Sequence, residues 1–180
     1  MVTQTNVLRT AKEAEDTADR SPSAQATAGG LPRPTRLPEV SDVIRLLDIR
    51  EEPLSVDEVY AAVLDERAGA VDVFIGTVRG EDRGRAVAGL GYTAHPSAIE
   101  RLREVAEAVA ETHPIRALSA LHRVGNLEIG DIAVIVAVSS GHRDDAFAAC
   151  QQLIDTLKAT LPIWKHQLFR DGSDEWVGTP

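Results

Sequence analysis

The sequence predicts an α+β domain with a mixed, mostly antiparallel sheet and three main helices. Apolar residues alternate or run continuously in six short segments, as in strands, and recur at helical spacing in three others. The connections are short, and the strands do not alternate regularly with helices as they do in a parallel α/β sheet. With 43% hydrophobic residues among 180, the chain can form a substantial core.

The N-terminal region differs in composition from the rest. Residues 1–38 contain four prolines, a Gly29–Gly30 pair and no aromatic residue, so they cannot bury enough apolar surface to fold. They lack the apolar stretch of a secretory signal, and their acidic residues argue against an organelle transit peptide. We expect a disordered extension over 1–38 and one folded domain over 39–180.

Three helices are expected in the folded region, at 55–67, 96–112 and 144–158. The first opens with a capping box, Ser55 followed by Glu58. The second begins near Pro96, which suits a first helical turn. Pro162 follows the third, because proline cannot continue a helix. Cys150, the only cysteine, falls on the apolar stripe of this third helix, so we expect a buried thiol and no disulfide within the chain.

Six strands are expected between these helices. Residues 132–138 are continuously apolar, which indicates a strand buried on both faces. The segment 79–86 is a charged, glycine-containing loop, 125–131 is a turn, and a short polar tail ends the chain. The remaining strands are expected at 43–49, 70–78, 87–93, 117–124 and 163–169.

The net charge of the chain excludes some classes of function. Acidic residues outnumber basic ones by 28 to 19, a net charge of −9, which argues against non-specific binding to nucleic acid or an anionic membrane. No apolar run is long enough to span a membrane. The five histidines have no zinc-type spacing, so we expect no metal site.

Two lysines near the end of the chain are the clearest catalytic candidates. The chain has 16 arginines but only three lysines, and Lys158 and Lys165 are seven residues apart. Unlike arginine, a lysine with a lowered pKa can act as a base or nucleophile. If the turn at Pro162 folds the strand back, the two amines could approach each other. Alternatively, Lys158 complements the helix dipole and Lys165 is a solvated strand residue.

Other candidates would bind an anion. His142 and Arg143 stand where a buried strand enters a helix, where free amides favour an anion, although a capped helix with surface charges explains them equally. Arg79 could bind a phosphate bidentately, or it could simply be solvated. His122 and Arg123 end another strand, and a structural role explains them better than ligand binding does.

Taken in order, these residues resemble one family. The blocks are Gly76-Thr77-Val78-Arg79, His122-Arg123-Val124-Gly125, Gly130-Asp131, Ser140-Gly141-His142-Arg143, Leu157-Lys158 and Pro162-Ile163-Trp164-Lys165. The set, running from about residue 43 to Trp176, resembles the catalytic (large, MoaE-type) subunit of molybdopterin synthase. The resemblance implies an α/β hammerhead fold and a cytoplasmic homodimer flanked by two small ubiquitin-like sulfur carriers, that is, a heterotetramer.

The resemblance also implies an activity. It implies a sulfurtransferase of molybdenum cofactor biosynthesis that converts cyclic pyranopterin monophosphate to molybdopterin. The two sulfurs come from the thiocarboxylated C-terminal Gly-Gly of the carrier, and the protein needs no cofactor of its own. Lys158 is then the main catalytic lysine, and Lys165 assists in substrate binding or proton transfer. The same resemblance places the other substrate-binding residues, partly across the dimer, at Thr77, Val78, Arg79, His142, Arg143, His166 and Gln167.

The chain departs from the family pattern at four positions. Thr93 and Gln167 stand where the family usually has carboxylates, His95 replaces a tyrosine, and Ala98 replaces a methionine. These departures motivate an alternative, a divergent paralogue that binds the carrier tail without turnover. A third hypothesis is a phosphate-ligand or nucleotide-binding protein that uses only Arg79 and the His142–Arg143 site.

Overall fold

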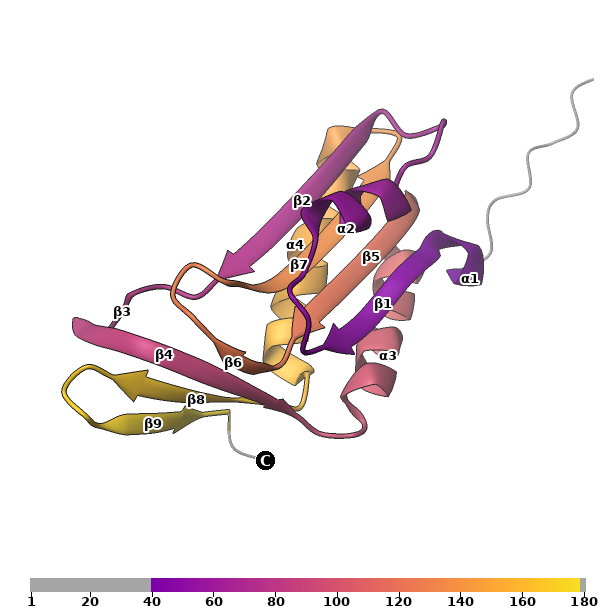
Figure 1. Cartoon of the computed structure of the whole chain (residues 1–180). Helices are drawn as coiled ribbons and strands as arrows, with labels where there is room; N and C mark the ends of the chain where they lie inside the picture. Colours follow the sequence, from indigo (N-terminus) through magenta and orange to yellow (C-terminus); the bar gives the residue numbers. More distant parts are fainter. Residues whose placement is uncertain (1–39, 179–180) are drawn as a thin grey trace, which may run out of the picture. The chain divides into compact units, whose positions relative to one another are not determined.

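The computed structural model describes residues 40–178 as an α+β fold, so the predicted class is confirmed (Figure 1). The predicted disordered extension over 1–38 lies outside the described residues. The helices are α1 (Val40–Val43), α2 (Val56–Ala62), α3 (Ala98–Thr112) and α4 (Arg143–Thr160). The strands are β1 (Ile44–Arg50), β2 (Ala70–Thr77), β3 (Glu81–Asp82), β4 (Arg85–Ala94), β5 (Ile115–Arg123), β6 (Gly125–Leu127), β7 (Ile132–Ser140), β8 (Ile163–Phe169) and β9 (Asp174–Val177).

The first sheet has the strand order β1-β5-β7-β2, with β1 parallel to β5 and the other pairs antiparallel. Helices cover both of its faces. On β7, Val134, Val136 and Val138 pack in a cluster with α3 and α4, whereas Ile135 and Ala137 pack in a second cluster with α2. The strand is therefore buried on both sides, as its continuous apolar run predicts.

The second sheet crosses one end of the first (Figure 1). Its order is β3-β4-β8-β9, all antiparallel, and β6 also pairs with β4. A small apolar cluster of Val78, Leu90, Leu127 and Ala133, with Tyr92 against it, joins residues from both sheets. In this cluster, Leu90 and Tyr92 of β4 pack against Ala133 of β7 and against Val78, which follows β2. The packing fixes how closely the two sheets approach each other.

The end of α4 connects the two sheets. Leu161 caps the helix by donating its backbone N–H to the Leu157 carbonyl at 2.9 Å. Pro162 then turns the chain into β8, and its carbonyl accepts a bond from the His95 backbone N–H at 3.0 Å. The last turn of α4 is thereby fixed beside the start of β8.

The predicted elements are found, but the structure differs from the prediction in several places. The expected loop 79–86 contains β3 and the start of β4, the expected turn 125–131 contains β6, and the short helix α1 precedes β1. Ser55 accepts a bond from the Glu58 backbone N–H at 3.2 Å, so the predicted N-cap is confirmed. The Glu58 carboxylate, which would complete the capping box, instead accepts a bond from Arg50 at 2.7 Å. Helix α2 ends at Ala62 rather than 67. The helix stops early because the Asp65 carboxylate accepts the backbone N–H of Arg67 and forms a turn. The expected C-terminal tail instead forms β9, paired with β8 through a turn in which Gly172 has φ 86°.

We predict that Gly69→Ala destabilises the fold. A Cβ at Gly69 would lie 2.6 Å from the Gly141 carbonyl oxygen, a backbone atom that cannot move away cheaply. We expect the free energy of unfolding to fall by about 1–3 kcal/mol, measured by urea denaturation. Gly141→Ala is the matched control, because its Cβ would meet nothing within 4 Å. Equal losses in the two variants would contradict the steric explanation.

Candidate active site

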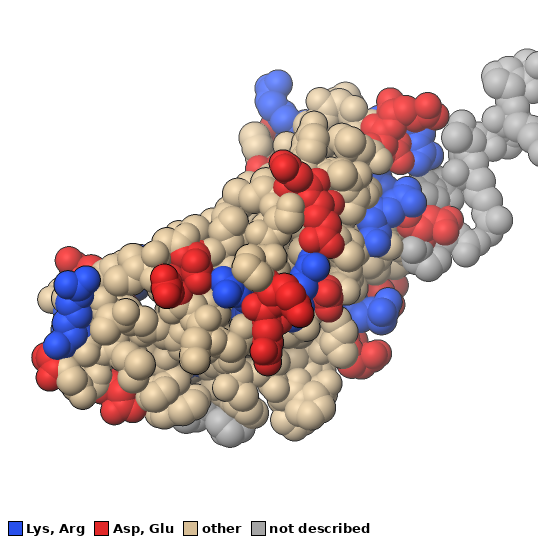
Figure 2. All heavy atoms as spheres, viewed as in Figure 1, with Lys and Arg blue, Asp and Glu red and all other residues tan. Residues whose placement is uncertain are grey.

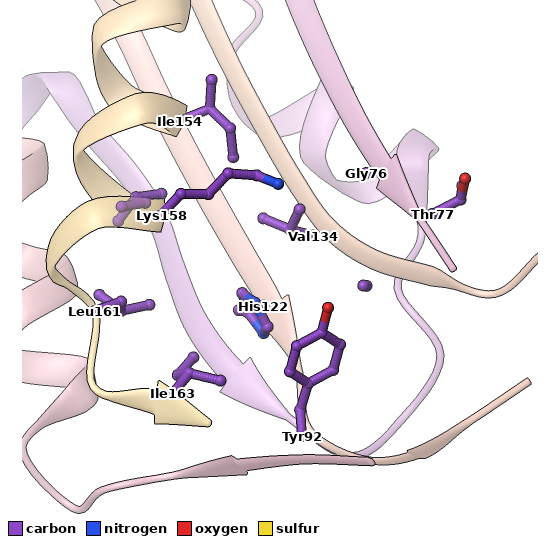
Figure 3. A pocket seen from close by; sticks show the side chains of 11 residues that line it. Gly76, Thr77, Tyr92, His122, Val134, Ile154, Lys158, Leu161 and Ile163 are labelled. Carbon is purple, nitrogen blue, oxygen red and sulfur yellow. The ribbon is translucent and has the colours of Figure 1, made fainter. Parts of the chain in front are cut away.

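A cavity of about 170 Å³ lies where the two sheets meet the end of α4. Figure 3 shows Lys158 extending from α4 towards β7, while the Tyr92 hydroxyl points from β4 into the same space. The apolar walls come from α4, β7 and β8, and the polar groups come from α4 and from the strands β2, β4 and β5. The lining residues are Gly76, Thr77, Tyr92, His122, Ala133, Val134, Ile154, Leu157, Lys158, Leu161 and Ile163.

The Lys158 ammonium is the cationic group of this cavity. It stands in the last turn of α4, where the helix dipole favours a cation, and the residue is exposed to solvent. Among residues 40–178 no carboxylate lies within ion-pairing distance of it. The amine is therefore available to an incoming anion or acyl group.

Gly76 keeps the opposite wall open. A Cβ at this position would lie 2.6 Å from a methyl of Val134, the residue paired with it on β7. Only the missing side chain lets β2 and β7 pack at this spacing beside the cavity.

His122 contributes a neutral imidazole to the same cavity. Burial lowers its pKa below the ordinary value, a bond to the Arg123 carbonyl opposes that shift, and the nearby Lys158 charge adds to it. His122 Nδ1 lies 2.8 Å from the Arg123 carbonyl oxygen, which can only accept, so Nδ1 carries the proton. In the neutral ring Nε2 is then the free acceptor.

Tyr92 forms the wall beside His122. Its ring lies 5.1 Å from the imidazole in an edge-on arrangement with an interplanar angle of 88°. Burial raises the pKa of the phenol, so the hydroxyl is neutral and can donate or accept in the cavity. Sequence reasoning missed Tyr92 as a lining residue and assigned His122 a structural role.

Lys165 lies near the cavity but is engaged elsewhere. It pairs with Tyr92 across β4 and β8, which places the two side chains on one face of the sheet. Its Nζ lies 3.8 Å from an Asp82 carboxylate oxygen, and Asp82 also accepts a hydrogen bond from Arg79. The Arg79 side chain is 74% exposed. These groups form a charged cluster beside the cavity rather than part of its lining.

The remaining predicted residues occupy three different places. Thr77 lines the cavity, and Val78 is buried in the cluster that joins the sheets. His142 and Arg143 stand at the first turn of α4, about 22 Å from Lys158 along the helix. Arg143 lies 3.6 Å from Asp144, and both side chains are exposed. Within one chain, therefore, His142 and Arg143 do not converge with the two lysines.

His166 lies on the opposite face of β8 from Lys165. Its ring stacks on Trp176 with centroids 4.4 Å apart and an interplanar angle of 8°. Its Nε2 lies 2.7 Å from an Asp174 carboxylate oxygen. Gln167 is buried and returns to the Lys165 face, where it helps to lower the pKa of Asp82.

The charges elsewhere are interspersed. Figure 2 shows acidic and basic side chains alternating over one face of the molecule, without a broad basic surface. No helix of the described residues has the length and apolarity to span a membrane. Within residues 40–178, no three His, Cys, Asp or Glu side chains cluster as a metal site.

Comparison with known proteins shows to which family the chain belongs. The profile described as MoaE protein matches residues 49–160. A molybdopterin synthase catalytic subunit from Halalkalibacterium halodurans is 39% identical over 131 residues, 72% of this chain and 83% of the relative. The human molybdopterin synthase catalytic subunit is 35% identical, over 74% of this chain and 71% of its own. The chain belongs to the MoaE family.

Solved structures agree with this assignment. Molybdopterin synthase from Staphylococcus aureus matches with a TM-score of 0.68 at 36% identity, covering 73% of this chain and 96% of that one. A chain from a complex of subunits 1 and 2 of the Helicobacter pylori molybdopterin-converting factor has the same fold, with a TM-score of 0.59 at 23% identity, over 73% and 89%. As a MoaE-family catalytic subunit of molybdopterin synthase, the chain is an enzyme subunit of molybdenum cofactor biosynthesis.

The departures from the MoaE pattern lie around the second sheet. Thr93 is exposed on β4, and the buried Gln167 is neutral where a carboxylate is usual. His95 Nδ1 lies 2.8 Å from the Ser97 hydroxyl at the start of α3, and Ala98 is buried one residue later. None of these four residues lines the cavity.

We predict that His122 makes folding stability depend on pH. The unfolded histidine titrates near pH 6.5, whereas burial lowers the pKa in the folded chain. Its stabilising effect is complete above pH 6.5 and is lost as pH falls towards the folded pKa, because the unfolded chain then binds more protons. Urea denaturation from pH 7.5 to 5 should show a steeper decline for the wild type than for His122→Gln.

His142→Gln is the control for this measurement, because His142 is exposed. It should keep the wild-type decline. A wild-type slope in His122→Gln would show that His122 is not the responsible group.

Proposed function

We propose that this MoaE chain transfers sulfur from a thiocarboxylated carrier protein to cyclic pyranopterin monophosphate and produces molybdopterin. The observation that carries the proposal is the Lys158 amine, which extends into an apolar cavity with a neutral His122 and Tyr92 on its walls. Apolar side chains beside the amine strengthen its electrostatic contact with an anionic acyl group. The membership in a family of molybdopterin synthase catalytic subunits supports the same reaction.

In the proposed reaction the carrier thiocarboxylate provides the nucleophile. Its sulfur forms a C–S bond to a side-chain carbon of the pterin while a C–O bond of that carbon breaks. For one sulfur the departing oxygen belongs to the cyclic phosphate, which opens to a monoester, and for the other it leaves as water. A second water hydrolyses each resulting thioester. The carrier leaves as a carboxylate, and the sulfur stays on the pterin as a thiolate. Lys158 stabilises the charge that develops at the carrier terminus and exchanges protons there. The buried Cys150 supports a sulfur source outside this chain, because its thiol has a pKa raised to about 12 by burial first and by the neighbouring Asp72.

The expected partner is a small ubiquitin-like carrier ending in Gly-Gly. A glycine tail is narrow enough to enter a cavity of about 170 Å³, and its terminal anion complements Lys158. The Helicobacter pylori fold neighbour is part of a complex of two subunits, which supports looking for such a partner here. Arg79 and Lys165 would bind the phosphate or the pterin beside the carrier terminus.

We propose further that the working unit is a homodimer with two carriers. His142 and Arg143 lie too far from Lys158 to share a site within one chain. They can join it only from a second copy. Edge strand β2 carries partly exposed Phe74 and Ile75, an apolar surface that the second copy would cover.

We predict that Lys158→Ala reduces product formation by about 10²-fold or more, since it removes the only amine in the cavity lining. The assay is conversion of the cyclic substrate by purified protein with thiocarboxylated carrier. Gln151→Ala, an exposed change on the same helix, should keep wild-type activity. Unchanged activity in Lys158→Ala would remove the mechanism. Carrier binding without product in the wild type would instead favour a non-catalytic paralogue.

We also predict that inactive variants complement each other. Lys158→Ala and Arg143→Ala should each be inactive alone, because each damages every site. In mixed dimers, one site of the pair receives both intact residues. After equal mixing and subunit exchange, about a quarter of wild-type activity should return. If no activity returns although mixed dimers form, the two residues do not share a site across the dimer.

A further inference from the structure

We propose that Asp82 is a positioning residue of this site, a built-in counter-ion that holds Arg79 and Lys165 until the anionic substrate displaces it. The inference rests on the proposed function, because it concerns how the same cations receive a phosphate. It assigns a role to a residue that lies outside the cavity lining.

Asp82 joins cationic groups from separate parts of the chain. It lies on the two-residue strand β3, and its side chain is only 15% exposed. One carboxylate oxygen accepts a hydrogen bond from the Arg79 guanidinium, and the other lies 3.8 Å from the Lys165 ammonium. Gln167, from the same face of β8 as Lys165, is buried. The contacts therefore converge on one carboxylate.

The Asp82 carboxylate is held in its charged form. The hydrogen bond from Arg79 is the main reason that the pKa of Asp82 lies below its ordinary value; burial opposes this shift, and the Lys165 charge adds to it. One carboxylate faces two cations, so the cluster keeps a net positive charge. A phosphate is attracted to that charge and bonds a guanidinium more strongly than one carboxylate oxygen does.

Asp82 also limits the motion of both cations. The Arg79 side chain is 74% exposed, and Asp82 is its only ion-pair partner among the described residues. Lysine and arginine lose much rotamer entropy when they are ordered. The carboxylate thus orders the two side chains before substrate arrives, and it competes with the substrate for them. Removing the carboxylate should make anion binding tighter, and it should leave the two cationic side chains less well ordered for the reaction.

The test is Asp82→Asn, which keeps the size of the side chain and removes its charge. With thiocarboxylated carrier and the cyclic substrate, we expect KM to fall by about threefold and kcat by about tenfold. A structural role alone would not lower KM and kcat together. Asp82→Glu should recover much of the wild-type kcat, because it restores the carboxylate.

Asp171→Asn is the matched control. Asp171 also pairs with an arginine, Arg85 at 3.5 Å, on the hairpin away from the cavity. It should leave KM and kcat unchanged. Unchanged kinetics in Asp82→Asn, or a rise in KM, would overturn the proposal.

A second measurement separates this inference from the proposed function. Calorimetry with inorganic phosphate needs no turnover, and phosphate should bind Asp82→Asn more tightly than the wild type or Asp171→Asn. Tighter binding together with an inactive wild type would leave the counter-ion role standing and remove the proposed reaction. Equal phosphate affinity in all three proteins would overturn the counter-ion role, whatever the activity.

Discussion

The reversal of the chain at Pro162 is the constraint on which the site depends. It ends α4 directly beside the start of β8, and the His95 backbone bond to the Pro162 carbonyl fixes the turn against the start of α3. Seven residues separate Lys158 from Lys165, but this turn places one on a helix and the other on a strand. Without the turn, the second sheet would have no fixed position against α4, and the cavity between them would not exist.

Electrostatics reconciles the acidic composition with the proposed anion site. The net charge is −9, yet the cations near the cavity are few and individually placed. Arg79 and Lys165 share Asp82, whereas Lys158 faces apolar walls and a neutral histidine. In surroundings of low polarity a single fixed charge acts more strongly than a broad basic surface does in water. The overall acidity and a local anion site are therefore compatible.

The sequence predicts best where the signal is local. The run over 132–138, the N-cap at Ser55 and the buried Cys150 follow from spacing and residue type, and the structure confirms them. The final strand β9 also had a local signal, since Asp171-Gly172 is a common hairpin turn. No local signal predicts Tyr92, His122 or Asp82 as site residues, because their proximity to the lysines depends on how the two sheets meet. Local periodicity carries no information about that contact.

Helix α4 sets a limit on how the predicted residues can cooperate. It is a single helix of 18 residues, with His142 and Arg143 at one end and Lys158 at the other. A helix rises about 1.5 Å per residue, so no side-chain rotation brings the two ends to one small ligand. The dipole favours an anion at the first end, where Asp144 and Asp145 stand in the first turn, and a cation at the second, where Lys158 stands. The two ends therefore serve either different ligands or the same ligand from different copies. A family pattern that contains both sets favours two copies, since a shared site makes the dimer itself part of the catalytic machinery.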